Sequence, residues 1–138
     1  MFQTITTVLV ASAFLASPAL AANPKKIFAG NYDGIAELEN KLGDTRFYSP
    51  VRFKITKSGE ITGTAKSYQT GKLVTVKGSI GKVTDMFGIR FLGKASGTFS
   101  DGTKWNAEVE AMKGVSAKGI RGKARRDGYS GTLSLTNL

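Results

Sequence analysis

Short runs of alternating apolar and polar residues, separated by glycine-containing turn dipeptides, dominate most of this sequence. In residues 51–55, Val-Arg-Phe-Lys-Ile, the apolar side chains fall on one face and the basic ones on the other. Alternation with this period is typical of β-strands that bury one face. The dipeptides Asp101-Gly102 and Asp127-Gly128, each placed between two such runs, indicate hairpin tips. The pattern therefore predicts an all-β chain built from consecutive hairpins.

The alternating runs predict eight or nine strands and no amphipathic helix. The strands are expected at residues 30–39, 49–57, 60–67, 72–79, 81–91, 94–100, 103–111, 119–126 and 129–137. The fourth and fifth of these are either one long bent strand or two separate strands. Because nearly all connections are short, successive strands are expected to pair as an antiparallel up-and-down meander. A single domain is expected over residues 22–138.

Five of the expected strands carry a glycine in the middle of their apolar face, flanked two residues away by apolar or small residues. These are Gly34, Gly63, Gly97, Gly122 and Gly131. A glycine inside a strand weakens it unless it permits a bend or a close approach. Repeated around a sheet, such glycines allow it to coil into a barrel. We therefore expect a small closed barrel in which the first and last strands pair, with a β-sandwich as the alternative.

The segment Gly30-Asn-Tyr-Asp-Gly34, followed by Phe53-x-Ile55-Thr-x-Ser-Gly-x-Ile61-x-Gly63, resembles bacterial exported β-meander domains of unassigned function. More distantly, the chain is similar to the calycin-like barrels, which have the lipocalin and avidin architecture. The resemblance extends over most of residues 22–138 and rests on turn and packing residues. It implies a small exported barrel of bacterial origin, and it implies no site residues.

The first 21 residues carry no charged side chain and contain an apolar run at residues 7–16. The run is shorter than the roughly 20 residues that a membrane-spanning helix needs. The small-x-small triplet Ala19-Leu20-Ala21 follows it and fits a signal-peptidase site. Residues 1–21 are therefore predicted to be a signal peptide, and the protein is expected to be exported, either to the periplasm or as a secreted protein.

The sequence contains neither cysteine nor histidine, which removes thiolate chemistry, His-dependent triads and the commonest transition-metal ligands. Glu108 and Glu110 lie about 7 Å apart along one strand face, a spacing compatible with a glycosidase pair. The favoured alternative is that both carboxylates pair with basic residues across the sheet. We expect no enzyme activity, no metal and no cofactor.

Basic residues outnumber acidic ones by 20 to 10, so the formal net charge is +10. The densest cluster comprises Lys118, Arg121, Lys123, Arg125 and Arg126. Alternation should direct Arg121, Lys123 and Arg125 to one side of a strand, where one anionic chain can contact all three. The cluster is therefore predicted to bind a polyanion, such as lipopolysaccharide phosphates or an acidic glycan. The alternative is that the charge only keeps the protein soluble and monomeric.

Residues 85–93 form the most apolar stretch after the signal segment. A buried core strand is the favoured interpretation of this stretch. The alternatives are a lid over the barrel mouth or a contact between copies of the chain, made by Met86, Phe87, Phe91 and Leu92.

Three functions are compatible with these observations. The leading hypothesis is a non-enzymatic exported module that binds an anionic partner through its basic face. Tyr48 and Tyr68 are candidate exposed aromatic residues for stacking on bases or sugars. The second hypothesis is a calycin-like carrier of a small apolar ligand inside the barrel, and the third is an accessory or inhibitor protein of the cell envelope. The oligomeric state is left open.

Overall fold

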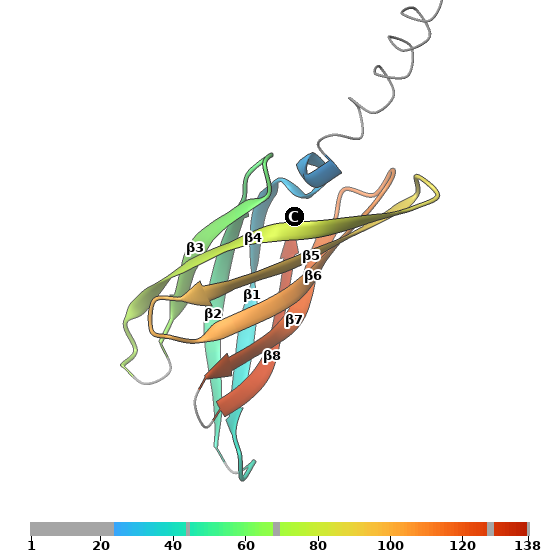
Figure 1. Ribbon diagram of the computed structural model, residues 1–138. Helices are drawn as coiled ribbons and strands as arrows, with labels where there is room; N and C mark the ends of the chain where they lie inside the picture. Colours follow the sequence, from blue (N-terminus) through green and yellow to red (C-terminus); the bar gives the residue numbers. More distant parts are fainter. Residues whose placement is uncertain (1–23, 44, 68–69, 127–128, 138) are drawn as a thin grey trace, which may run out of the picture.

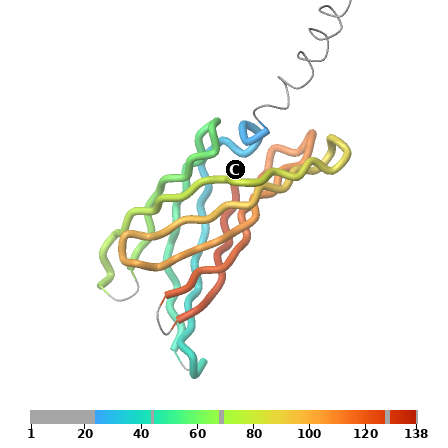
Figure 2. The backbone as a smooth tube through the Cα atoms, viewed as in Figure 1, coloured from blue at the N-terminus to red at the C-terminus, as the bar shows by residue number. Residues whose placement is uncertain are grey.

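The computed structural model describes residues 24–43, 45–67, 70–126 and 129–137. A short 3-10 helix, η1 (Pro24–Phe28), precedes eight strands. They are β1 (Gly30–Asn40), β2 (Arg46–Ile55), β3 (Glu60–Lys66), β4 (Leu73–Met86), β5 (Arg90–Phe99), β6 (Lys104–Met112), β7 (Lys118–Arg126) and β8 (Tyr129–Asn137). Each strand pairs antiparallel with the next, and β8 pairs with β1 to close a barrel (Figures 1 and 2). The predicted all-β meander and its closure are confirmed, and the sandwich alternative is wrong.

Three sequence predictions concern positions outside the described residues. These are the signal peptide at residues 1–21, the exposure of Tyr68, and the hairpin tip at Asp127-Gly128. Over the part of the chain that is described, no helix combines the length and apolar character required to cross a membrane.

The two segments expected on either side of residue 80 form a single strand, β4, as the long-strand alternative predicted. The register between β4 and β5 shifts just after Ile80, which marks an irregularity in the ladder. The predicted continuation of this strand to residue 91 is wrong, because the chain turns back at Phe87 and Gly88. Phe87 has a φ of 58°, a conformation that aromatic residues rarely adopt, so its side chain gave no turn signal.

The mid-strand glycines lie where neighbouring strands approach too closely for any side chain. A Cβ atom added at Gly34, Gly63, Gly97, Gly122 or Gly131 would overlap a backbone carbonyl oxygen of the adjacent strand. These are the five positions that the sequence pattern singled out. The close approach at each of them lets the sheet coil tightly enough to close, which is the role predicted for them.

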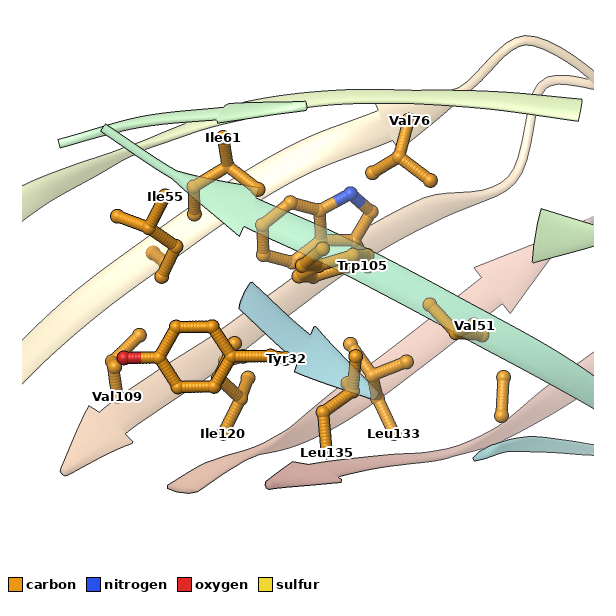
Figure 3. Close-up of a cluster of buried hydrophobic side chains, with 14 of the residues drawn as sticks. Tyr32, Val51, Ile55, Ile61, Val76, Trp105, Val109, Ile120, Leu133 and Leu135 are labelled. Atoms are coloured by element: carbon orange, nitrogen blue, oxygen red, sulfur yellow. The ribbon is translucent and has the colours of Figure 1, made fainter. Parts of the chain in front are cut away.

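Large side chains fill the barrel interior (Figure 3). The rings of Phe53 and Trp105 pack with their centroids 4.9 Å apart. Trp105 also lies over Gly78, where an added Cβ would come within 2.5 Å of the indole ring. Within the described residues, the Trp105 Nε1–H group is buried without a hydrogen-bond partner. The indole is therefore held by packing alone.

Helix η1 lies at one end of the barrel, where it contacts β4 and β6 (Figure 1). Its last residue, Phe28, is fully buried, and the hydroxyl of Tyr32 donates a 2.6 Å hydrogen bond to the Phe28 carbonyl. The Lys118 ammonium donates to the carbonyls of Ala29 at 2.6 Å and Ile27 at 3.2 Å. Partial burial lowers the pKa of Lys118. These contacts hold η1 against the end of the barrel core.

The β5–β6 hairpin turns at Asp101-Gly102, as predicted. The Gly102 N–H donates to the Phe99 carbonyl at 3.0 Å, and Gly102 has a φ of 93°. The Asp101 carboxylate accepts a 3.0 Å hydrogen bond from the Thr103 N–H. Asp101 itself does not adopt positive φ, so the loop is a turn completed by one left-handed glycine and not the two-residue hairpin turn in which both central residues have positive φ.

Replacing Gly102 with valine should destabilise the protein by about 1 kcal/mol or more, because a β-branched residue tolerates positive φ poorly. Nothing lies within 4 Å of the position that the new Cβ would occupy, so the loss would report backbone conformation rather than a clash. Chemical denaturation followed by circular dichroism measures it. Gly102→Asn is the control, since asparagine tolerates this region better. Equal stability of both variants and the parent would contradict the prediction.

Candidate polyanion-binding surface

Strand β7 presents a row of basic side chains on the outer face of the barrel. Arg121, Lys123 and Arg125 are exposed there, and they alternate with inward-facing residues such as Ile120 and Ala124. The predicted alternation of the three basic residues is therefore confirmed. Successive members of the row lie about 7 Å apart along the strand.

The register of β6 against β7 adds a cation that sequence reasoning did not assign to this surface. Lys104 lies directly opposite Arg125, and Asn106 lies directly opposite Lys123. Because paired strands are separated by about 4.8 Å, the two basic residues Lys104 and Arg125 are immediate neighbours. Lys104 is exposed beside the buried Trp105, in keeping with the alternation of this run, and its pairing with β7 locates it on this surface.

Lys104, Lys123 and Arg125 line a shallow hollow of about 890 Å³ on the outer face. Hydroxyl and amide side chains surround these cations, and Glu39 also lines the hollow. The polar neutral members are Ser96, Thr98, Asn106, Ser130 and Thr132. We call this surface the basic trough. A second hollow of about 500 Å³ adjoins it and shares Lys104, Arg125 and Ser130, with Lys41 and Arg126 as further basic residues.

The other members of the predicted basic cluster are positioned differently. Lys118 lies among the inward-facing residues of β7 and holds η1, as described above. Arg126 donates a 3.3 Å hydrogen bond to the Asp101 carboxylate, in a pair whose side chains are 24% and 14% exposed. Arg121 lies opposite Glu108 in the ladder. The structure thus brings Lys123 and Arg125 together in the trough and gives Lys118 and Arg126 internal partners.

Two other basic residues of the outer face, Arg52 and Arg46, lie beside carboxylates. Arg52 pairs with Asp33 at 3.2 Å. Arg46 lies 3.5 Å from Glu37 and 3.7 Å from Glu39, and hydrogen bonding to Tyr48 together with these carboxylates raises the pKa of Arg46. By contrast, no ion pair between described residues engages any of the three trough cations. The trough therefore brings together three cations that have no ion-pair partner among the described residues, and Glu39, which also lines it, lies beside Arg46.

The carboxylate pair on β6 does not form an isolated acidic site. Glu110 accepts two hydrogen bonds from Arg90, at 2.9 and 3.2 Å, as the cross-strand alternative predicted. This contact raises the pKa of Arg90. Glu108 is exposed and lies between Lys94 and Arg121 in the two neighbouring ladders. Among the described residues, no group of three acidic side chains is arranged to hold a metal ion.

The apolar stretch at residues 85–93 is not a buried core strand, contrary to the favoured prediction. Phe91 packs against the core and Leu92 is half-buried. Met86 and Phe87 are exposed at the end of the hairpin, where the strands extend beyond the barrel and no other described element covers them. Of the alternatives, an exposed patch describes Met86 and Phe87, and the structure does not place Phe91 in it.

A small hollow lies at the end of the barrel remote from η1. It measures about 20 Å³ and is lined by apolar residues such as Ala36, Ala65 and Phe99 and by polar ones that include Lys66 and Asp101. That volume is close to what a single water molecule requires.

Comparison of the chain with models of protein families, with curated proteins and with solved structures gives no match. The resemblance to exported β-meander domains and to calycin-like barrels therefore stays a prediction. Function has to be inferred from the geometry of the basic trough.

Proposed function

We propose that this protein is a non-enzymatic exported module that binds an anionic polymer through the basic trough. The observation that carries the proposal is the convergence of Lys104, Lys123 and Arg125 in one hollow, without ion-pair partners among the described residues. Phosphate, sulfate and carboxylate groups accept hydrogen bonds from these cations and from the hydroxyl groups around them. Spacing of about 7 Å along β7 suits successive charged groups of one chain.

The proposed partner is a polyanion of the bacterial cell envelope, such as a phosphorylated lipopolysaccharide core or an acidic glycan. This part of the proposal rests on the signal-peptide pattern of residues 1–21, which predicts export from the cytoplasm. Nucleic acid offers the same charge but is less accessible there. A carrier role gains little support, because the inner hollow holds about one water molecule's volume.

Charge reversal of the trough should remove most of the retention on immobilised heparin. We expect the triple variant Lys104→Glu, Lys123→Glu, Arg125→Glu to elute at much lower salt, since each lost phosphate-type contact removes about one unit from the salt slope of binding. The slope of log affinity against log salt should therefore fall by about three.

The matched control reverses Lys54, Lys66 and Lys72, which are exposed on the far side of the barrel. It makes the same change in net charge and should retain most of the heparin affinity. Equal losses in both variants would mean that bulk charge, rather than the trough, is responsible. Elution of the parent protein at low salt would refute polyanion binding itself.

A further inference from the structure

The β4–β5 hairpin projects beyond the body of the barrel (Figures 1 and 2). Past the register shift after Ile80, most side chains of residues 81–90 are exposed. The β6–β7 turn runs beside this projection, and the Lys113 N–H donates a 2.7 Å hydrogen bond to the Ile89 carbonyl. The two turns therefore form one joined protrusion at the η1 end.

Five exposed apolar side chains cover this protrusion. They are Met86, Phe87 and Ile89 from the β4–β5 turn, and Met112 and Val115 from the β6–β7 turn. We call these residues the apolar tip. Phe87 is 95% exposed and Ile89 58% exposed. Single exposed apolar residues are ordinary, whereas a contiguous group on a projection marks an interaction surface.

The backbone at Phe87 is strained in a way that packing does not explain. Phe87 and Gly88 have φ values of 58° and 68°, in a turn closed by the Ile89 N–H and the Met86 carbonyl at 3.1 Å. Asparagine or glycine is the usual residue at such a position. A phenylalanine there adopts an unfavourable conformation, yet its ring gains almost no burial within the chain. Strain of this kind is typical of residues kept for an interaction.

The charges around the apolar tip are mainly positive. Exposed Lys82 and Lys113 flank it, whereas Asp85 accepts a 2.7 Å hydrogen bond from the Gly88 N–H. Arg90 and Glu110 neutralise each other just below. The same end of the barrel also carries basic residues on η1 and in the β2–β3 turn, namely Lys25, Lys26 and Lys57.

We propose that the apolar tip docks on an anionic lipid surface. A convex apolar projection with lysines behind it can enter the headgroup layer while the cations meet lipid phosphates. The shape favours lipid over a second protein, because a narrow projection needs a matching groove in a protein but none in a fluid bilayer. This surface is separate from the basic trough, so the inference does not depend on the proposed function.

Tryptophan placed at the tip can report insertion directly. In the full chain, Phe87→Trp should give a blue-shifted emission on addition of vesicles that contain phosphatidylglycerol, and brominated lipids should quench it. The native Trp105 is buried in the core and contributes a constant background. Leu42→Trp is the control, since Leu42 is 83% exposed in the β1–β2 turn, at the opposite end. Its emission should stay unchanged.

A second variant tests whether the Phe87 side chain, rather than the conformation of the turn, is needed for docking on lipid. Phe87→Asn keeps a residue that tolerates the turn conformation, so the barrel should unfold at equal or higher denaturant concentration. A protein that carries Ile89→Trp as the fluorescent reporter allows this substitution to be tested. Adding Phe87→Asn to it should reduce the vesicle-induced blue shift several-fold. Charge reversal of the three trough cations should leave the vesicle-induced blue shift of the Phe87→Trp protein largely unchanged.

Three results would overturn the proposal. The first is no shift at Phe87→Trp with anionic vesicles. The second is an equal shift at Leu42→Trp, which would mean that another part of the chain brings the whole protein to the membrane. The third is a shift that grows with protein concentration in the absence of lipid, which would identify the tip as a contact between copies of this chain.

Discussion

Replacing Gly97 with alanine should destabilise the barrel by about 3 kcal/mol, at the upper end of the range for overpacked sites. The new methyl group would overlap the Lys77 carbonyl oxygen and lie 2.6 Å from the Gly78 Cα. Both atoms belong to the backbone of β4, so no side-chain rotation can relieve the clash. The strands would have to separate, which weakens ladder hydrogen bonds and the packing of Trp105 on Gly78. Urea denaturation followed by circular dichroism measures the loss.

Gly81→Ala is the matched control for this prediction. The nearest atom to its added Cβ is the Lys94 carbonyl oxygen at 3.7 Å, an ordinary contact, and its backbone is not left-handed. The same change there should shift stability by no more than about 0.5 kcal/mol. Similar effects at both glycines would contradict the view that close strand approach, rather than glycine content, sets the barrel's geometry.

Truncation of Trp105 to alanine should cost about 3 to 5 kcal/mol, the range for removing a large aromatic ring from a core. The indole is 3% exposed and packs on both Phe53 and the Gly78 backbone, so its removal leaves a cavity that rigid strands cannot close. Thermal and urea unfolding monitored by circular dichroism give the loss, since the only tryptophan is then absent.

Trp105→Phe should lose much less than Trp105→Ala. Phenylalanine keeps a ring against Phe53 and removes the indole N–H, which lacks a partner among the described residues. Eliminating an unpaired buried donor offsets about 1 to 3 kcal/mol of the packing loss. If the phenylalanine variant were as unstable as the alanine variant, the indole N–H would have to be making a favourable interaction.

Much of the fold followed from the sequence, because its determinants are local. Alternation fixes which residues face inward, and Gly34, Gly63, Gly97, Gly122 and Gly131 mark the points of close strand approach. The Phe87 turn was missed because its residue type opposes its backbone conformation. Prediction from residue type fails where the residue and its backbone conformation disagree, and such a position is more informative about function than about folding.

The candidate site was only partly predictable, because it depends on contacts between distant segments. Lys123 and Arg125 were found from their alternation, but Lys104 joins them only through the register of β6 against β7. Lys118 was counted with the cluster because its charge is visible in the sequence. Its partners, the carbonyls of Ile27 in η1 and of Ala29 just after it, lie about ninety residues away along the chain. Proximity in the sequence therefore does not identify which side chains interact in the closed barrel.

The ladder between β1 and β8 also determines when the protein can fold during its synthesis. It joins Asp33 to Thr136, almost the full length of the barrel domain. Until the ribosome has released the residues of β8, β1 and β7 each present an unpaired edge and the core is open along one side. A nascent chain that lacks this strand therefore has no closed intermediate to adopt. Closure of the barrel must follow release of β8, and the step that pairs β1 with this distant strand is expected to be slow.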